Sequence, residues 1–227
     1  MNPDEVARRG EQLGGSAWRR FLQSVPGQIL VNPPVHRLHR SIPLRADHRV
    51  LEVGCGAGSR LLLLDNNTRF SHALSAGVEP TPSLVSRAGS TFVSRARPLS
   101  ALAADPASLP FADASYDIAL CGDLLRFLDV RGAQSALREI ARVLRPGGLL
   151  IAWDLAPAAG RFGWWQRFWL RRYPGRIASA NNLMSLAERS GFEYSRDAEL
   201  RPYFWPPIPR VSFVASTPVA PAMEGEG

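Results

Sequence analysis

Residues 50–58 read VLEVGCGAG, an apolar run that leads directly into a turn with three glycines. The following RLLLL at 60–64 has the character of a buried helix start. A glycine-rich turn between a strand and a helix lets the backbone approach a ligand closely, because glycine has no Cβ and tolerates positive φ. The stretch therefore predicts the first strand–turn–helix unit of an α/β domain, with a cofactor site at the turn.

Strands and helices are expected to alternate from this unit onward. Apolar runs predict further strands at 73–78, 99–103, 116–121, 149–153, 192–200 and 210–216, and helical periodicity predicts helices at 83–93, 133–144 and 181–190. The sequence PGG at 146–148 predicts the turn into the fifth strand. Repeated βα units favour a doubly wound parallel sheet with helices on both of its faces.

The 227 residues suit one α/β domain with appendages. Residues 1–45 predict an N-terminal helical cap, built from helices at 3–24 and 33–42. Residues 46–217 form the main domain, with an insertion near 155–180 as a lid. Residues 218–227 lack any apolar period, and we expect a disordered tail there.

The basic side chains are all arginine, since the 27 basic residues include no lysine. This excludes Schiff-base aldolases, pyridoxal phosphate enzymes and P-loop NTPases, each of which needs a lysine in its site. The net charge of +7 is compatible with binding to nucleic acid or to an anionic membrane surface. The use of arginine alone can equally reflect the base composition of the genome.

The chain contains no apolar run near the roughly 18 to 20 residues that span a bilayer. Its first residues, MNPDEVARRGEQ, lack the basic stub and apolar core of a secretory signal. We therefore expect a cytoplasmic protein, with any membrane contact peripheral. Cys55 and Cys121 are too few for a disulfide framework or a cysteine zinc site, and we expect no metal.

Two acids follow neighbouring strands of the expected sheet. Glu79 ends the second strand, where a carboxylate accepts hydrogen bonds from both hydroxyls of a ribose. Asp105 follows the third strand and precedes LPF at 109–111. Their positions predict that both carboxylates converge on the glycine turn.

The ordered motifs resemble those of small-molecule class I S-adenosylmethionine-dependent methyltransferases of the type 11 kind. The resemblance covers residues 50–153 and is carried by VLEVGCGAG at 50–58, GVEP at 77–80, AD at 104–105 with LPF, YD at 116–117 and LRPGG at 144–148. It implies a Rossmann-like seven-stranded sheet whose last strand is antiparallel, and S-adenosyl-L-methionine as cofactor.

By that resemblance, each cofactor-binding residue has an expected role. Glu79 would bind the ribose, Asp105 the adenine amino group, and Glu52 the methionine amino group through water. The backbones of Gly54 and Gly56 would border the methionine part. The complete expected set is Glu52, Gly54, Cys55, Gly56, Gly58, Glu79, Pro80, Asp105 and Pro106.

A dehydrogenase is the main competitor, because it also pairs a glycine turn with an acid after the second strand. Its fingerprint prefers Gly-x-Gly-x-x-Gly, whereas the third glycine comes one residue early at Gly58, with Ser59 in the expected place. Asp105 would also have no role in hydride transfer. A nucleic-acid methyltransferase and a non-catalytic binding protein on this fold stay open, although no base-reading motif argues for the former.

The acceptor end of the site is less defined. Asp123 and Asp154 follow the fourth and fifth strands, at the edge where open α/β sheets bind ligands, and are candidates for a general base or for orienting the acceptor. A base is optional in methyl transfer, because much of the catalysis is alignment.

Residues 161–173, RFGWWQRFWLRRY, concentrate aromatic and arginine side chains, and no acid occurs between Asp154 and Glu188. If helical, this segment resembles an interfacial helix, which favours an apolar or lipid-like small-molecule acceptor and peripheral membrane contact. The alternative is a lid helix packed on its own domain.

Overall fold

The computed structural model describes residues 24, 26, 44–68, 75–96, 99–171, 175–197 and 209–219. The helices predicted at 3–24 and 33–42, and with them the N-terminal cap, lie almost entirely outside these ranges. Most of the tail predicted at 218–227 lies outside them as well. The division of the chain into cap, main domain and tail therefore stays a prediction.

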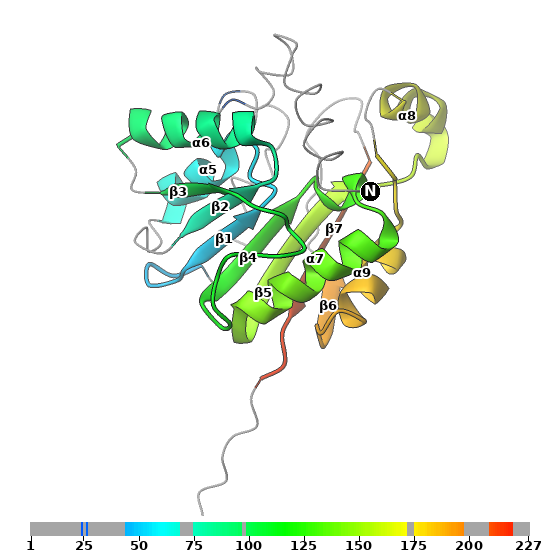
Figure 1. The fold of residues 1–227 in the computed structure, drawn as a ribbon. Coiled ribbons are helices and arrows are strands. Elements are labelled where there is room, and N and C mark those ends of the chain that lie inside the picture. The colour runs from blue at the N-terminus through cyan, green and yellow to red at the C-terminus, as the bar shows by residue number, and fades with distance from the viewer. Residues whose placement is uncertain are drawn as a thin grey trace, which may run out of the picture.

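The described residues form a mixed sheet in the order β3-β2-β1-β4-β5-β7-β6. Strands β1 to β5 run parallel, whereas β7 is antiparallel to both β5 and β6 (Figure 1). The strands are β1 (Val50–Val53), β2 (Ala76–Glu79), β3 (Ser100–Ala103), β4 (Tyr116–Gly122), β5 (Leu144–Leu155), β6 (Tyr194–Asp197) and β7 (Arg210–Ser216). The doubly wound α/β class and the antiparallel last strand are confirmed.

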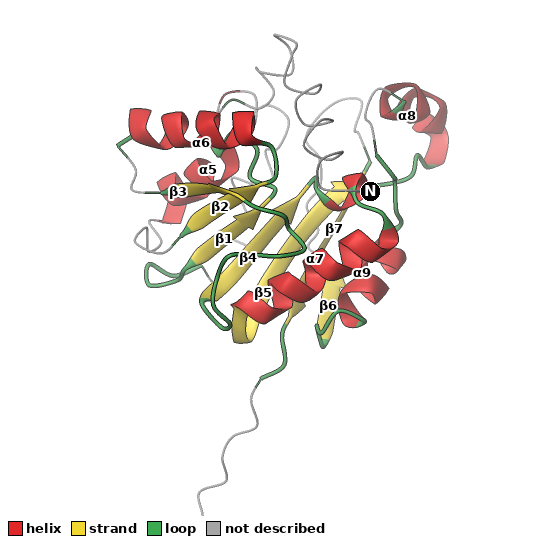
Figure 2. Cartoon of the chain, in the orientation of Figure 1, coloured by secondary structure: helices red, strands yellow, loops and turns green. Residues whose placement is uncertain are grey.

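Helices cover both faces of this sheet. They are α5 (Ser59–Thr68), α6 (Pro82–Ser94), α7 (Val130–Val143), α8 (Gly163–Leu170) and α9 (Ala180–Glu188), with short 3-10 turns η3 (Leu125–Phe127) and η4 (Gly160–Phe162). In Figure 2, α7 and α9 lie across the front of the sheet.

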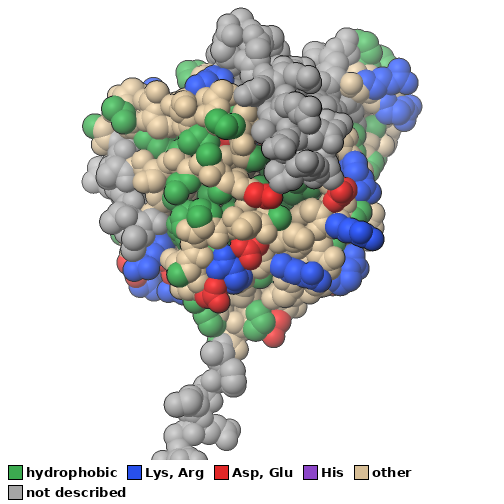
Figure 3. Space-filling model, viewed as in Figure 1, with side chains coloured by type: hydrophobic (Ala, Val, Ile, Leu, Met, Phe, Trp, Pro, Cys, Tyr) green, Lys and Arg blue, Asp and Glu red, His purple; other side chains and the backbone are tan. Residues whose placement is uncertain are grey.

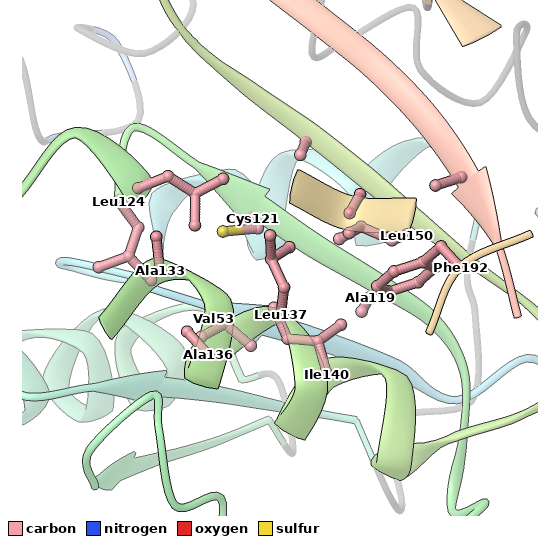
Figure 4. Close-up of a cluster of buried hydrophobic side chains, with 14 of the residues drawn as sticks. Val53, Ala119, Cys121, Leu124, Ala133, Ala136, Leu137, Ile140, Leu150 and Phe192 are labelled. Carbon is pink, nitrogen blue, oxygen red and sulfur yellow. The ribbon is translucent and has the colours of Figure 1, made fainter. Parts of the chain in front are cut away.

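The two helical layers follow from the alternation of side chains along each strand. Val53 and Cys121 point to the layer of α7, where they pack with Leu137 and Ile140 (Figure 4). Other residues of the same sheet point to the opposite face. There, Val50, Ile118 and Ile151 pack with Leu61 of α5 and Phe92 of α6. Continuous apolar strands, buried on both faces, are typical of such parallel sheets.

Two of the element boundaries that differ from the sequence prediction have a local structural cause. Helix α7 begins three residues before Ala133, because the Asp129 carboxylate caps it by accepting a hydrogen bond from Gly132 N at 2.7 Å. Strand β5 begins at Leu144, so the turn predicted at 146–148 is a bulge within the strand. The register there jumps from Tyr116–Leu144 to Ile118–Leu149, and Gly147 has a φ of 73°.

The parallel strands bring several loops to one edge. Val53 of β1 pairs with Val78, Glu79 of β2 pairs with Ala103, and Gly122 of β4 pairs with Trp153. The residues that follow these strands therefore share the carboxyl edge of the sheet, where open α/β folds bind their ligands.

Candidate functional site

The glycine turn after β1 has positive φ angles at all three glycines: 79° at Gly54, 55° at Gly56 and 75° at Gly58. The N–H groups of Gly54 and Cys55 donate to the Val78 carbonyl at 2.8 and 3.0 Å, which ties the turn to the end of β2. A side chain is excluded at Gly58 by packing, since a Cβ would lie 2.6 Å from the Phe92 ring. At Gly56 a Cβ would meet nothing within 4 Å, so the turn leaves open space there for a ligand.

Glu79 joins this turn to the next loop. Its Oε2 accepts a hydrogen bond from Gly56 N at 3.1 Å, and its Oε1 accepts one from Thr81 N at 3.1 Å, across Pro80. Burial raises the pKa of the Glu79 carboxyl, while Thr81 and Gly56 partly oppose that rise. Each oxygen keeps a further lone pair, so the carboxylate fits two ribose hydroxyls beside the open side of the turn.

Asp105 lies two residues beyond Ala103, the register partner of Glu79, and so follows the neighbouring strand at the same edge. Its Oδ1 accepts a hydrogen bond from Ala107 N at 2.9 Å, which closes a tight turn over the buried Pro106. Among the described residues, Oδ2 has no hydrogen-bond donor. Within these ranges, that oxygen keeps the capacity to accept a hydrogen bond from an amino group.

Arg142 holds the loop that carries Asp105. From α7 it donates to the carbonyls of Phe111 at 2.9 Å and Leu109 at 3.0 Å, and it pairs with Asp113 and Glu139. Glu139 in turn accepts a hydrogen bond from Leu109 N at 2.8 Å. This clamp fixes residues 109–113 against α7, and sequence reasoning did not single out either of its two residues on α7.

Glu52 lies inside β1, two residues before the glycine turn. Its side chain is fully buried and pairs with Arg60, on the first turn of α5, at 2.6 Å. Arg60 also donates to the carbonyls of Gly54 at 2.6 Å and Gly122 at 3.2 Å, so one guanidinium joins the ends of β1 and β4. Burial raises the pKa of Glu52 despite Arg60.

Asp123 directly follows β4 and has a φ of 59°, an uncommon conformation for a residue other than glycine. Its carboxylate lies between two arginines, 3.0 Å from Arg126 Nη1 and 3.7 Å from Arg60 Nη1. Burial alone would raise its pKa, but Arg126, Arg210 and Arg60 together hold the pKa below its ordinary value. With a fifth of its side chain exposed, Asp123 presents an ionised carboxylate at the acceptor end of the edge.

Asp154, at the end of β5, is only 2% exposed and is surrounded by donors. Its Oδ2 accepts from Arg126 N at 2.9 Å, and its Oδ1 accepts from Leu155 N at 2.7 Å and Arg126 Nη1 at 3.2 Å. Burial raises its pKa to about 6 despite the arginine. These contacts make Asp154 a support for Arg126, and through Arg126 for Asp123.

Three buried polar atoms of this edge have no partner among the described residues: Glu52 Oε2, Arg126 Nε and Trp153 Nε1. The Trp153 indole lies over Gly122, and the Arg60 guanidinium lies 5.6 Å from the centre of its ring. Buried polar atoms in proteins are normally hydrogen-bonded, to water or ligand if not to protein. The orphaned atoms therefore fit a polar group or ordered water beside the turn.

Sequence reasoning found the acids of this edge and missed its arginines. Glu79, Asp105, Asp123 and Asp154 could be picked out because each lies at or just beyond a strand end, whereas Glu52 followed from the family resemblance. With 27 arginines in the chain, no pattern marked Arg60 or Arg126. Their partners are set by packing between segments, such as Arg126 with Asp154 at a separation of 28 residues.

A glycine turn after β1, an acid at the end of β2 and a second acid after β3 form the arrangement with which α/β proteins bind a nucleoside-containing cofactor. A family model described as "Methyltransferase domain" matches residues 51–152. The O-methyltransferase cnsE of Penicillium expansum is 30% identical over 208 residues, which cover 84% of this chain and 70% of that protein. The chain belongs to the class I S-adenosylmethionine-dependent methyltransferases, whose methyl donor is S-adenosylmethionine.

Other relatives match over shorter stretches. The malonyl-[acyl-carrier protein] O-methyltransferase of Dechloromonas aromatica is 33% identical over 54% of this chain and 42% of its own length. The O-methyltransferase resE of Aspergillus sclerotiorum is 36% identical over 48% of this chain and 40% of its own length. The chain thus spans less than half the length of these two relatives.

Solved structures share the fold at low sequence identity. The [4+2]-cyclase SpnF has a TM-score of 0.67 at 20% identity, covering 91% of this chain and 84% of that one. The YcgJ protein of Bacillus subtilis has a TM-score of 0.66 at 19% identity, covering 83% of this chain and 99% of that one. Since one of these proteins is described as a cyclase, the fold alone does not define the reaction.

Proposed function

We propose that this chain transfers a methyl group from S-adenosylmethionine to a small apolar acceptor. The observation that carries the proposal is the hydrogen bond from Gly56 N to Glu79 Oε2, beside open space at the turn. It leaves a buried carboxylate facing the place where the backbone of the turn is bare. Relatives described as O-methyltransferases and as a demethylmenaquinone methyltransferase support a small-molecule acceptor.

The donor would be held by the predicted set of residues around the turn. Glu79 would accept hydrogen bonds from the ribose hydroxyls, and Asp105 Oδ2 one from the adenine amino group. The backbones of Gly54, Cys55 and Gly56 would border the methionine part, with Gly58, Pro80 and Pro106 shaping the turns. Glu52, neutralised by Arg60, would contact the methionine amino group only through water at its unpaired Oε2. When bound, the donor supplies an electrophilic methyl group.

At the acceptor end, we assign the direct role to Asp123 and the positioning role to Asp154. An ionised carboxylate with a lowered pKa accepts a hydrogen bond from a hydroxyl and aligns its oxygen for in-line displacement. Alignment of reactants is worth about 7 to 11 kcal/mol of barrier, which is why a weak base suffices. Asp154 holds Arg126 in place, and Arg126 holds Asp123.

The aromatic residues at 161–173 support an acceptor of apolar character. A membrane that the protein contacts peripherally would be a source of such an acceptor. We also propose a cytoplasmic location. A nucleic-acid acceptor is the alternative that the arginines favour, and salt-dependent binding of RNA or DNA by the full chain would support it instead.

The proposal is tested by isothermal titration calorimetry with S-adenosylhomocysteine. We expect the full chain to bind it, and Glu79→Gln to weaken the affinity about 10- to 100-fold, since hydrogen bonds to a charged group contribute about 1.5 to 3 kcal/mol. Asp47→Asn, at an exposed acid that pairs with Arg45 away from the glycine turn, is the control and should bind within a few-fold of wild type. A full chain with no measurable affinity would overturn the enzyme assignment.

A further inference from the structure

Helix α8 presents an aromatic surface to solvent. It stands away from the sheet at the upper right of Figure 1. Trp164 is 65% exposed and Phe168 is 45% exposed, and their spacing of four places both on one face of the helix. Trp165 joins them, with its ring stacked on Phe168 at 5.8 Å and edge-on to Trp164 at 5.7 Å. Of the large apolar side chains exposed in the described ranges, the two aromatic ones are these.

Hydrogen bonds of α8 and of the segment after it help to position this surface. Gln166 is buried, and its Oε1 accepts a hydrogen bond from Ala159 N at 2.9 Å, which ties α8 to the strap that precedes it. Beyond the end of the helix, Arg176 N donates to the Arg126 carbonyl at 2.7 Å. The segment after α8 therefore contacts the residues that follow β4 at the carboxyl edge of the sheet.

The surroundings of the aromatic surface are strongly positive. Arg161, Arg167, Arg171 and Arg176 are exposed on and beside α8. No acid occurs in the sequence between Asp154 and Glu188, so this stretch of the chain carries a net positive charge. Figure 3 shows arginine side chains gathered over the place that α8 occupies in Figure 1.

We propose that α8 docks on an anionic lipid surface, with Trp164 and Phe168 inserted at the level of the headgroups and the arginines on lipid phosphates. Aromatic rings prefer the interface of a bilayer, and arginines bind phosphate while keeping their stems against apolar surface. A short helix with exposed aromatic rings suits the interface of a bilayer, and the exposed arginines beside it favour an anionic one. None of the helices in the described ranges is long and apolar enough to cross a bilayer, so the contact is peripheral.

Docking would place the carboxyl edge, with Asp123 close to Arg126, against the lipid. That arrangement would deliver an apolar acceptor from the membrane to the site. Delivery rests on the proposed function, whereas docking itself does not.

The test is flotation of the full chain with vesicles of phosphatidylcholine containing about 30% phosphatidylglycerol, compared with phosphatidylcholine alone. We expect binding to the anionic vesicles that weakens as salt rises. Trp164→Ala with Phe168→Ala should lower the partition coefficient about tenfold or more, since it removes most of the inserted apolar area. Arg167→Gln with Arg171→Gln should lower binding to anionic vesicles only.

Matched controls keep the same chemistry elsewhere on the surface. Val93→Ala with Val130→Ala truncates exposed apolar side chains on α6 and α7, and Arg131→Gln with Arg138→Gln removes two exposed charges from α7. Both control pairs should float like wild type, and circular dichroism melts should show that all variants fold.

Equal flotation of wild type and the Trp164/Phe168 variant, or no flotation of wild type, would overturn the docking proposal. The docking proposal would also be overturned if the Arg131/Arg138 control variant lost as much binding to anionic vesicles as the Arg167/Arg171 variant. Affinity for S-adenosylhomocysteine, measured on the same variants without vesicles, separates the two proposals. A chain that floats and does not bind the nucleoside refutes methyl transfer and leaves docking intact.

Discussion

Gly56 and Gly58, the second and third glycines of the turn, meet different constraints although both have positive φ. Gly58 is required by packing, because a Cβ there would lie 2.6 Å from Phe92. Gly56 faces open space and donates its N–H to Glu79. The protein uses one glycine to seat α6 against the turn and the other to let a ligand reach the backbone.

We expect alanine at these two positions to have opposite signatures. Gly58→Ala should lower the free energy of unfolding by about 2 to 4 kcal/mol, from overpacking against Phe92 and a strained φ. Gly56→Ala should cost only about 1 kcal/mol from its φ, and should abolish most of the affinity for S-adenosylhomocysteine. Urea denaturation and calorimetry on both variants measure the two effects. If Gly56→Ala binds like wild type, the ligand does not approach the turn at this residue.

Asp123 is the residue at which acceptor chemistry is best tested. Asparagine tolerates the same positive φ, so Asp123→Asn removes the charge and keeps the backbone. For an acceptor with a hydroxyl group, we expect kcat/KM to fall about 10²- to 10⁴-fold, as for loss of a positioned base or acceptor. Affinity for S-adenosylhomocysteine should stay within a few-fold of wild type.

The control for Asp123 is Asp47→Asn, which removes a surface carboxylate paired with Arg45 and should leave kcat/KM unchanged. Retention of full activity by Asp123→Asn would show that the acceptor is aligned by other groups.

At the scale of elements, the loop between β3 and β4 is shaped by α7. Residues 109–113 have no regular structure of their own, yet Arg142 and Glu139 bind their backbone at Leu109 and Phe111. The same loop carries Asp105. Helix α7 thereby supports the loop that would make the proposed adenine contact.

Arg142→Gln should therefore act on cofactor affinity from a distance. We expect S-adenosylhomocysteine to bind about 3- to 10-fold more weakly, because the loop must be ordered on binding and each ordered backbone residue costs about 1 to 2 kcal/mol of entropy. In the Arg142→Gln variant, Asp105→Asn should weaken S-adenosylhomocysteine binding by a smaller factor than it does in the wild type, because the two residues are coupled. Arg131→Gln, an exposed arginine of the same helix, should have no effect. Strictly additive losses would contradict positioning through the loop.

The sequence allowed prediction of those helices and strands that bury one or both of their faces. Strands at 50–53 and 210–216 were predicted with the bounds observed, since their apolar runs stop where burial stops. The start of α7 was missed because its first turn is exposed and carries Gly132, so only the cap at Asp129 marks it. A bulge such as that at Gly147 depends on the register with β4, which no single strand specifies.

The acids of the site were predictable and their electrostatic partners were not. Position after a parallel strand places an acid at the carboxyl edge whatever the loop does, which holds for Glu79 and Asp123. The pairing of Glu52 with Arg60 depends on how α5 lies against β1. That pairing leaves Oε2 as the unpaired oxygen of Glu52, through which the expected water-mediated contact with the cofactor would be made.

At the scale of the whole molecule, positive charge dominates the chain while acids gather at the carboxyl edge. Glu52, Asp123 and Asp154 share the edge with Arg60 and Arg126, and Arg210 also acts on Asp123. The three acids and three arginines of this cluster balance when all are ionised. The cluster stores an ionisation cost in the fold, because Asp154 is buried with a pKa raised to about 6.

That cost predicts how stability depends on pH. In the unfolded chain Asp154 titrates at its ordinary pKa of 3.8, and in the folded protein at about 6. Between these values the folded state holds more protons, so the contribution of Asp154 to the free energy of unfolding falls as pH rises from about 4 to about 6. Asp154→Asn does not titrate, although its amide clashes with the Arg126 N–H and makes the variant less stable at every pH.

The advantage of wild type over Asp154→Asn should therefore be largest near pH 4 and shrink by up to about 3 kcal/mol by pH 7. Urea denaturation of both proteins across this range measures the difference. Asp123, whose pKa is lowered, acts in the opposite sense and only below pH 3.8, so it does not obscure the window. A constant difference between pH 4 and pH 7 would mean that Asp154 is ionised throughout, in which case Arg126 outweighs burial and the edge carries its full negative charge even in mild acid.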